Sequence, residues 1–326
     1  MERMQISVAI ATFNGAKYLE AQLESILGQT RQPDELVISD DNSTDNTIEI
    51  IENFKINAPF EVKLLINPNN GYNSNFQNAF KNSTGDFIFI CDQDDYWFKT
   101  KIEDVSEYFK DNPDCYLIIH DLQYTDMNLN PLPLTKVKRF KKFRNLDNYV
   151  TGMATTVRRE LLNDCLPIPN GVNYDTWLHN IALNLGKRCI YEKVLSLYRR
   201  HESNATKSNI INSSSELTLN QYIWHKINND SLYNAKRKKK LYLALINWIK
   251  KKEFEKSSLV SCNTTLKKRQ LLIKDTLKTL DERINLLKKN IITRFIPLSL
   301  LYLKGGYTYF SGFMTYIKDI ISTSKK

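Results

Sequence analysis

Short apolar runs alternate with stretches of helical spacing along the first part of the chain. The runs are typical of buried β-strands, because they are short and are bounded by polar and turn residues. They lie at residues 5–11, 35–41, 61–67, 86–92 and 115–121. The stretches between them repeat apolar residues every three or four positions, which predicts amphipathic helices at 16–29, 43–54, 73–83 and 99–113. Ser43 is the predicted N-cap of the second helix.

This alternation predicts an α/β fold with a mostly parallel central sheet and helices on both faces. In such sheets, ligands bind at the carboxyl ends of the strands. Farther along, we expect a strand and a helix in 150–162, a helix in 174–186, and one or two strands in 187–201. From about residue 216 onward the pattern is helical.

The charge changes sign along the chain. Residues 1–206 hold 22 Lys and Arg against 28 Asp and Glu, whereas residues 207–326 hold 24 against 8. We therefore expect two parts, an α/β domain over 1–206 and a basic α-helical region over 207–326. Such a basic region can bind nucleic acid or an anionic membrane surface. The alternative is a solvated helical appendage with no binding role.

Carboxylates cluster at the end of one predicted strand. In the stretch GDFIFICDQDDYW, an apolar run leads directly into Asp92, Asp94 and Asp95. Like charges this close repel one another and raise one another's pKa values. A divalent cation held by oxygen ligands is the simplest partner for them.

Asp40 and Asp41 end another predicted strand, so both acidic strand ends lie at one edge of the sheet. One ligand explains both, a nucleotide diphosphate with a metal. Asp41 can accept a hydrogen bond from a pyrimidine base, while Asp40 caps the local turn. The Asp92-Gln93-Asp94 trio can hold Mg²⁺ or Mn²⁺. Neither G-x-x-x-x-G-K nor G-x-G-x-x-G follows a strand, which argues against P-loop and dinucleotide sites.

The five cysteines are scattered and form no C-x-x-C pair, so the sequence indicates neither a disulfide framework nor a zinc site. The N-terminal apolar stretch, residues 6–11, is too short for a signal peptide. No run approaches the ~20 residues of a membrane span. We therefore expect a reducing, cytoplasmic setting, with the protein either free or bound peripherally to the inner face of the cell membrane.

Five motifs over residues 5 to about 205 resemble the inverting glycosyltransferases of family 2, which have the GT-A nucleotide-diphospho-sugar transferase fold. The motifs stand in the family's order and spacing, and they are VAIATFNGAKYLEAQLESILGQT, ISDDNSTDNT, NPNNGYNSNFQNAF, GDFIFICDQDDYWFKTKI and YRRHESN. The forms DQDDYW and YRRH most resemble the bacterial rhamnosyltransferase-like members that build surface polysaccharide.

The resemblance implies roles for individual residues. Asp94 of the DxD motif is the expected direct metal ligand and His201 the second metal residue, with Mn²⁺ or Mg²⁺ as the cofactor. Asp175 lies where the family places its catalytic base. The residues expected to contact the nucleotide-sugar are Ala11, Thr12, Phe13, Asp41, Asn70, Gly71, Asp92, Arg199 and Arg200.

The mechanism that the resemblance implies is a single displacement. Asp175 takes the proton of an acceptor hydroxyl, which attacks the anomeric carbon from the face opposite the diphosphate. The alternative for Asp175 is a structural role as the N-cap of its own helix. Trp97 and Trp177 are expected to be core aromatics rather than walls of an acceptor pocket.

By resemblance, dTDP-rhamnose is the first expectation for the donor and UDP-hexoses the second, with a saccharide acceptor that is expected to be lipid-linked. A nucleotidyltransferase would need a Gly-rich, basic signature near the first strand, which ATFNGAKYLE lacks. A nucleic-acid-binding protein would need base-reading modules. Because none is evident in the sequence, we expect no nucleic acid partner. The basic segment 235–254 resembles an interfacial amphipathic helix, and equally a scaffold for a homodimer.

Overall fold

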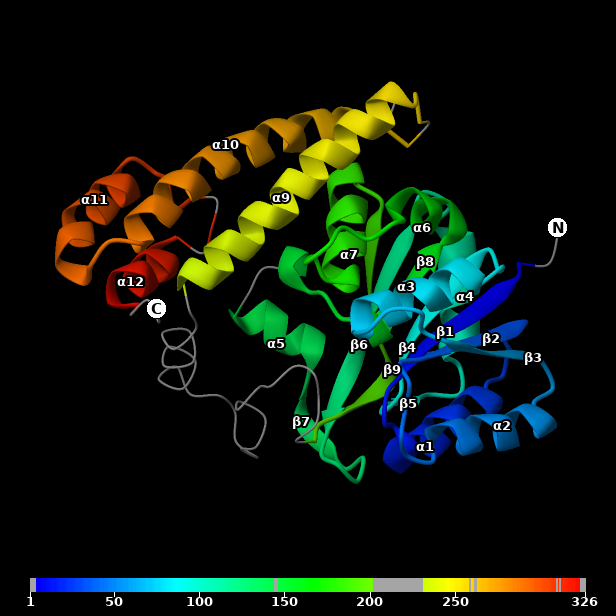
Figure 1. The fold of residues 1–326 in the computed structure, drawn as a ribbon. Helices are drawn as coiled ribbons and strands as arrows, with labels where there is room; N and C mark the ends of the chain where they lie inside the picture. Colours follow the sequence, from blue (N-terminus) through cyan, green and yellow to red (C-terminus); the bar gives the residue numbers. More distant parts are fainter. Residues whose placement is uncertain are drawn as a thin grey trace. The chain divides into compact units, whose positions relative to one another are not determined.

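The computed structural model describes residues 4–143, 146–201, 231–257, 259–260, 263–308, 310 and 312–322 (Figure 1). The chain divides into two compact units, Met1–Lys207 and Ser208–Lys326. The first unit begins with strands and helices in strict alternation, namely β1 (Ile6–Thr12), α1 (Ala16–Leu27), β2 (Glu35–Asp40), α2 (Thr47–Asn57), β3 (Glu61–Ile66), α3 (Tyr72–Asn82) and β4 (Phe87–Asp92).

The second half of this unit is less regular. Its elements are β5 (Tyr96–Trp97), α4 (Lys101–Asp111), β6 (Leu117–Thr125), β7 (Pro131–Thr135), α5 (Lys136–Phe143), β8 (Thr155–Arg158), α6 (Arg159–Cys165), α7 (Tyr174–Leu185) and β9 (Arg188–Arg199). The predicted strands and helices are confirmed to within a few residues, and the long strand β9 accounts for the strand pattern expected over 187–201.

The strands form one sheet in the order β3-β2-β1-β4-β8-β6-β9-β5, with β7 paired to β6. β1 pairs in parallel with β2 and with β4, and β2 pairs in parallel with β3, as βαβ units require. β8 lies between β4 and β6 and is antiparallel to both. The fifth predicted strand, β6, is therefore not next to β4 but pairs in parallel with β9.

The core of the sheet lies in β1, β2 and β4, where nearly every residue is buried. Continuous apolar runs have this property because both faces of the strands are covered by helices. From α1, the stripe residues Leu19, Leu23 and Ile26 are buried against the sheet, whereas Leu27 is 38% exposed. Trp97 and Trp177 are both 1% exposed, so the expectation of core aromatics is confirmed.

The start of α2 differs from the prediction. The helix begins at Thr47 after Asn46, not after Ser43. The Ser43 hydroxyl instead accepts a hydrogen bond from the Asn14 N–H at 2.8 Å and donates to Asp40 at 2.6 Å. Ser43 as an N-cap was wrong because its side chain ties the loop after β1 to the loop after β2.

One disulfide joins Cys115, just before β6, to Cys189 in β9. The two cysteines are 74 residues apart and come together because β6 and β9 are neighbours, with Ile118 opposite Cys189. The scattered cysteines of the sequence did not indicate this pair, and the reducing setting stays a prediction. Cys91 and Cys165 are buried free thiols.

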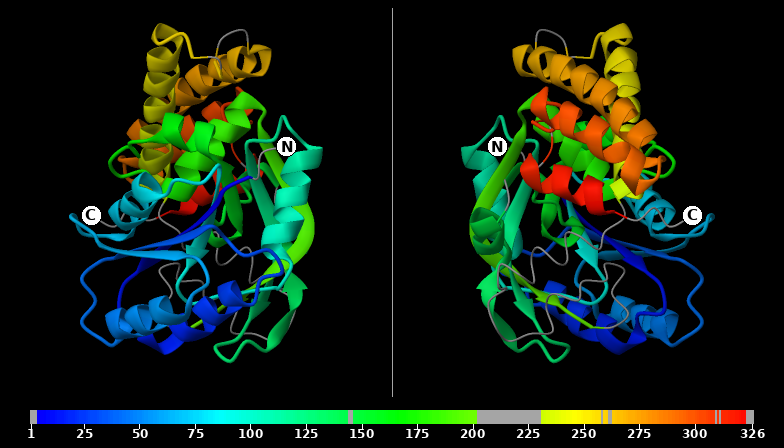
Figure 2. Two further views of the ribbon diagram at one scale, coloured as in Figure 1. Left: turned by 90° about the vertical axis from the view of Figure 1, so that its right-hand side faces the viewer. Right: turned by 90° about the vertical axis from the view of Figure 1, so that its left-hand side faces the viewer.

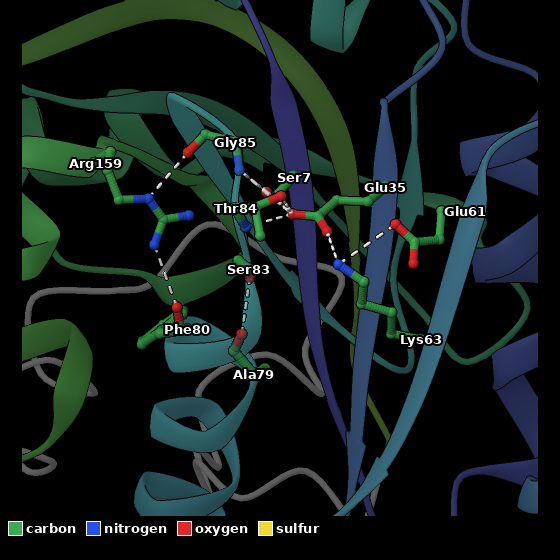
Figure 3. A network of polar contacts seen from close by, with 10 residues as sticks. All are labelled: Ser7, Glu35, Glu61, Lys63, Ala79, Phe80, Ser83, Thr84, Gly85 and Arg159. Atoms are coloured by element: carbon green, nitrogen blue, oxygen red, sulfur yellow. Dashed lines mark hydrogen bonds and ion pairs between the residues drawn. The ribbon is translucent and has the colours of Figure 1, made fainter.

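A buried carboxylate fastens the amino-terminal edge of the sheet (Figure 3). Glu35 accepts hydrogen bonds from the Ser7 hydroxyl, from the Thr84 N–H at 2.5 Å and from Lys63 Nζ at 2.6 Å. Gly85 lies so close that an added Cβ would meet Ser7 N and Ser7 Oγ at 2.7 Å. This edge is therefore held by polar contacts and lies opposite the edge where the acidic strand ends meet.

The second unit contains α9 (Ser231–Phe254), α10 (Thr264–Leu287), α11 (Ile291–Leu303) and α12 (Phe313–Ile321), drawn in yellow to red in Figure 2. This confirms the helical pattern for the described residues, whereas 216–230 lies outside them. Arg283 donates two hydrogen bonds to buried Asp319, at 2.8 and 3.1 Å, and the Tyr307 hydroxyl donates a third at 2.8 Å. Within the described part of the chain, no helix is long and apolar enough to cross a bilayer.

Candidate active site

The carboxyl ends of β1, β2 and β4 meet at one edge of the sheet, as the parallel pattern predicts. Ala11 of β1 lies opposite Asp92 of β4, and Thr12 lies opposite Asp40 of β2. Because β1 lies between the other two strands, the acidic ends of β2 and β4 lie on either side of it. The two clusters of carboxylates singled out in the sequence, Asp40 with Asp41 and Asp92 with Asp94 and Asp95, therefore lie at one edge of the sheet.

Asp40 fastens the ends of β1 and β2. It is fully buried, and its carboxylate accepts hydrogen bonds from Thr12 Oγ1 at 2.7 Å and from the Ser43 N–H at 2.7 Å. The Thr12 carbonyl accepts the Asp41 N–H at 2.9 Å. Asp40 thus has the structural role expected of it, and the Thr12 side chain is buried in the same contact. Its neighbour Phe13 is 55% exposed and offers surface to a ligand.

Asp41 is partly exposed and organises the loop before α3. Its Oδ1 accepts a hydrogen bond from Asn67 Nδ2 at 2.6 Å, and its Oδ2 accepts the Gly71 N–H at 2.8 Å. Gly71 has φ +98°, in the region that favours glycine, and Asn70 before it is exposed. The structure therefore brings the predicted nucleotide-contacting residues Asp41, Asn70 and Gly71 together.

Gln93 does not join the carboxylates on either side of it. Its Oε1 accepts the Phe13 N–H at 2.9 Å, and its Nε2 donates to the Phe13 carbonyl at 3.1 Å. Gly15 lies directly against the Gln93 amide, since an added Cβ there would lie 2.4 Å from Gln93 Oε1 and would displace it. The Gln93 side chain therefore ties the acidic loop to the end of β1, while metal binding by the Asp92-Gln93-Asp94 trio stays a prediction.

The third carboxylate of the cluster is Asp95. Asp92, Asp94 and Asp95 each offer an oxygen, and these oxygens lie within 4.8 Å of one another. Asp95 is fully buried, and its Oδ1 accepts the Arg199 N–H at 3.0 Å. Its Oδ2 is buried and has no hydrogen-bond partner among the described residues. Such an atom is costly to leave unsatisfied, which favours a ligand at this position.

The pKa values of Asp92 and Asp95 are raised, as expected of crowded carboxylates without a neighbouring cation. Burial, followed by the charges of Asp94 and Asp175, raises the pKa of Asp92 to about 7. Burial, followed by the charges of Asp94 and Asp92, raises the pKa of Asp95 well above its ordinary value. Closely spaced carboxylates with only oxygen donors fit a hard divalent cation such as Mg²⁺ or Mn²⁺, which would allow all of them to ionise.

His201 and Asp94, the two predicted metal residues, are in direct contact. His201 Nε2 lies 2.8 Å from Asp94 Oδ2, and both side chains are largely buried. The His201 ring also packs on the Tyr18 ring, with 4.5 Å between the ring centroids. The last residues of the YRRHESN motif, 202–204, lie outside the described residues.

Arg199 and Arg200 have protein contacts in this structure. Buried Arg199 donates from Nε to the Asp94 carbonyl and from its guanidinium to the Met127 carbonyl, both at 2.7 Å. Arg200 donates to the Tyr198 hydroxyl at 3.3 Å. Arg199 thus fixes the backbone of the acidic loop, while contact of either arginine with a diphosphate stays a prediction.

Asp175 lies in the first turn of α7, and Asn173 is the residue that caps the helix. The alternative of Asp175 as an N-cap was therefore wrong. Its Oδ1 accepts the Thr176 N–H at 2.5 Å. Its charge is among those that raise the pKa of Asp92, and it also acts on the buried ammonium of Lys136. Asp175 therefore lies near the acidic cluster in space.

The family model for "Glycosyl transferase family 2" matches residues 7–166 of this sequence. The chain carries a family 2 glycosyltransferase domain. The match ends before Asp175, so it covers the strand ends and the acidic cluster but not the predicted base. The resemblance drawn from the motifs is confirmed at the level of the family.

Curated relatives of this family 2 domain include sugar transferases. The dTDP-rhamnosyl transferase RfbG of Shigella flexneri is 29% identical over 215 residues, which cover 62% of this chain and 74% of RfbG. An uncharacterized glycosyltransferase of Nostoc is 30% identical over 215 residues, covering 62% of this chain and 66% of that protein. The poly(ribitol-phosphate) beta-N-acetylglucosaminyltransferase TarS of Staphylococcus aureus is 30% identical over 118 residues, which are 21% of its length.

Solved structures confirm the GT-A fold. S. aureus TarS 1-349 in complex with UDP-GlcNAc superimposes with a TM-score of 0.54 at 19% identity, covering 98% of this chain and 90% of that one. The mannosyltransferase PcManGT from Pyrobaculum calidifontis, in complex with GDP-Man and Mn²⁺, gives 0.53 at 15% identity, covering 98% and 87%. At these identities the likeness concerns the fold alone.

Nothing in the sequence singles out two lysines near the acidic cluster of the family 2 domain, the buried Lys101 and the half-buried Lys136. Lys101 is fully buried, donates to the Met153 carbonyl at 2.8 Å and lies 3.6 Å from the Trp97 ring. Lys136 donates to the Thr151 hydroxyl. Burial lowers the pKa of each lysine to about 7, against the opposing charges of nearby acidic groups. Both residues lie in Lys-rich local sequence, where nothing marks one lysine as buried.

Proposed function

We propose that the chain is a metal-dependent, inverting glycosyltransferase that moves a sugar from a nucleotide-diphosphate donor to a saccharide acceptor. The observation that carries the proposal is the acidic cluster at the end of β4, where Asp92, Asp94 and Asp95 face one another and His201 contacts Asp94. This cluster lies beside the loop that Asp41 organises, at the sheet edge where α/β proteins bind ligands.

The nucleotide half of the donor binds between the ends of β1 and β2. Asp41 is the proposed contact for the base, and the exposed ring of Phe13 with Ala11 supplies apolar surface for the nucleoside. Asn70 and Gly71 close over it, because the Gly71 N–H already couples their loop to Asp41. Arg199 and Arg200 are the proposed cations nearest the diphosphate.

Asp94 and His201, with Asp92 and Asp95, are the residues that would hold Mn²⁺ or Mg²⁺. A bound cation of this kind stabilises negative charge on a departing diphosphate. The chain's own part is to keep the carboxylates in place, and Arg199 does so through its bonds to the Asp95 carboxylate and the Asp94 carbonyl.

Asp175 is the proposed general base. It takes the proton from the acceptor hydroxyl while that oxygen forms a bond to the anomeric carbon, and the bond from this carbon to the diphosphate breaks. Attack from the face opposite the leaving group inverts the anomeric configuration. The proximity of Asp175 to the acidic cluster supports this role, since base and leaving group must flank one sugar.

Rhamnose from dTDP-rhamnose is the proposed sugar, and the acceptor is proposed to be a lipid-linked saccharide in the synthesis of bacterial surface polysaccharide. The similarity to RfbG supports this choice of donor. A UDP-hexose donor is the second candidate, supported by the similarity to TarS. The two candidates use the same site and differ in the nucleoside of the donor and in the sugar that is transferred.

A donor panel tests the proposal. The protein is incubated with dTDP-rhamnose, UDP-hexoses and GDP-mannose, with Mn²⁺, with Mg²⁺ or with EDTA, and release of the nucleoside diphosphate is measured. We expect metal-dependent release from dTDP-rhamnose, and none from the Asp94→Asn variant. Folded protein that releases diphosphate from no donor in the panel would overturn the proposed function, and release from a UDP-hexose alone would overturn the choice of rhamnose.

A further inference from the structure

Helix α11 carries an exposed apolar face. The side chains of Ile292, Phe295, Ile296, Leu300 and Leu303 are 83%, 51%, 67%, 51% and 78% exposed. They recur at three- and four-residue spacing, which places them along one side of the helix. Large apolar side chains that stand singly on a surface need no explanation, but a continuous row of five marks a surface for interaction.

The opposite side of α11 is also apolar and is already used. Leu298 is fully buried and Leu301 is 8% exposed, and both pack with Tyr307. Arg294 on the same side is buried, and its guanidinium donates to the carbonyls of Ile320 and Ser322. One face of α11 thus packs against the second unit, and the opposite face, with the apolar row, is exposed.

The charged residues that flank α11 in the sequence have one sign. Residues 283–318 contain no Asp or Glu. Lys288 and Lys289 lie just before α11 and Lys304 just after it, and all three are exposed. The apolar row therefore has ammonium groups at both ends, which is the arrangement that attracts anionic headgroups to a helix lying in a membrane interface.

A second copy of the chain fits this face less well. Two α11 helices packed antiparallel would bring Lys288 and Lys289 of one copy to Lys304 of the other. Two packed in parallel would bring each lysine to its own counterpart, and no acidic residue of 283–318 could compensate in either arrangement. A bilayer with anionic lipids covers the apolar row and pairs with the lysines at once.

We propose that the exposed face of α11 docks onto an anionic lipid bilayer, with the helix lying in the plane of the interface. The 13 residues of α11 span about 20 Å, which is shorter than the hydrocarbon core, so the helix lies on the membrane rather than across it. The sequence pattern of 235–254 suits an interfacial helix and a homodimer scaffold equally well. In α9, however, Leu241, Leu245 and Ile249 are buried, whereas the row of five apolar side chains on α11 is exposed.

Vesicle flotation of the full chain tests the inference. The vesicles are phosphatidylcholine with or without phosphatidylglycerol, and neither donor nor acceptor is present, so the result does not depend on the proposed reaction. We expect flotation with the anionic vesicles and little with the neutral ones. The Ile292→Ser/Ile296→Ser variant should bind at least about tenfold more weakly, because two apolar side chains no longer enter the bilayer.

The matched control is Leu271→Ser/Leu272→Ser, which removes two side chains of α10 that are 65% and 48% exposed and should bind within twofold of the unchanged chain. Lys288→Gln and Lys304→Gln should each weaken anionic binding about fivefold. Unchanged thermal unfolding of the Ile292→Ser/Ile296→Ser variant shows that it folds. The inference would be overturned if the unchanged chain does not float, or if the two double variants float equally. It would also be overturned if the chain is a dimer in solution and only Ile292→Ser/Ile296→Ser dissociates it.

Discussion

The side-chain amide of Gln93 pairs with the backbone of Phe13, accepting its N–H at 2.9 Å and donating to its carbonyl at 3.1 Å. These two bonds join the acidic loop after β4 to the loop after β1. The proposed metal ligands and the proposed nucleoside surface are thereby held at a fixed separation. The middle residue of the DQD sequence thus aligns the two halves of the proposed donor site.

Replacing Gln93 with Leu should weaken this alignment. Loss of two hydrogen bonds should cost about 1 to 2 kcal/mol of stability, and the affinity for a nucleoside diphosphate should fall about tenfold because the two loops no longer hold their spacing. Thermal unfolding and calorimetric titration measure the two effects. Gln32→Leu is the matched control, since Gln32 also donates to two carbonyls, those of Leu27 and Gln29, at the amino-terminal side of β2. Equal loss of affinity in both variants would contradict the aligning role.

Replacing Asp94 with Asn should remove the response to metal. With UDP or dTDP present at about 100 times its dissociation constant, Mn²⁺ should raise the unfolding temperature of the unchanged protein by about 5 °C. The variant should show no such shift, and EDTA should abolish it in the unchanged protein. Asp114→Asn, which removes an exposed carboxylate paired with Lys187, should leave the shift intact. A full manganese shift in the Asp94 variant would remove Asp94 from the metal site.

Replacing Asp175 with Asn should separate transfer from donor binding. The turnover number should fall about 10² to 10⁴-fold, because a general base is lost, while the dissociation constant for the donor stays within about twofold. Steady-state transfer assays and donor titration measure these quantities. Glu160→Gln is the control, because it removes a carboxylate from the first turn of α6 instead of α7. It should leave the turnover number and the dissociation constant unchanged. Full turnover by the Asp175 variant would assign the base elsewhere.

Glu35 should make stability depend on pH in the acid range. Although burial acts to raise its pKa, hydrogen bonds from Lys63, Ser7 and Thr84 outweigh burial and lower the pKa of Glu35 from 4.5 to about 2. The folded state therefore gains stability from the ionised carboxylate above pH 4.5 and loses it as the pH falls toward 2. Urea unfolding at several pH values should show Glu35→Gln less stable by about 3 kcal/mol at pH 7.

The difference between Glu35→Gln and the unchanged protein should shrink below pH 4.5 and vanish near pH 2. Glu61→Gln is the control, because Glu61 contacts the same lysine at 3.4 Å but is 62% exposed, and it should change stability little. A difference for Glu35→Gln that stays constant from pH 7 to pH 3 would show that its ionisation does not stabilise the fold.

The sequence predicts those features that depend on local pattern. The buried runs of β1, β2 and β4 are recognisable because parallel strands covered on both faces are apolar throughout. Since parallel strands align their carboxyl ends, the position of Asp41 and of the Asp92 and Asp94 cluster at one edge of the sheet also follows from the pattern. The family resemblance adds Asp175 and His201, which no local pattern would connect to that cluster.

The features that the sequence does not predict depend on contacts between distant segments. β8 enters the sheet between β4 and β6 by antiparallel pairing, and no turn or spacing rule specifies that register. Cys115 meets Cys189 only because β6 and β9 become neighbours. The full burial of Lys101 and the partial burial of Lys136 likewise arise from the tertiary fold, since lysine is ordinarily a surface residue.

The most direct test of the central claim is a crystal structure of the protein grown with Mn²⁺ and dTDP, with anomalous diffraction collected at the manganese edge. The account predicts an anomalous peak bound by an oxygen of Asp94 and in contact with the diphosphate, between the end of β4 and His201. A well-ordered diphosphate with no manganese at Asp94, or manganese bound elsewhere, would contradict it.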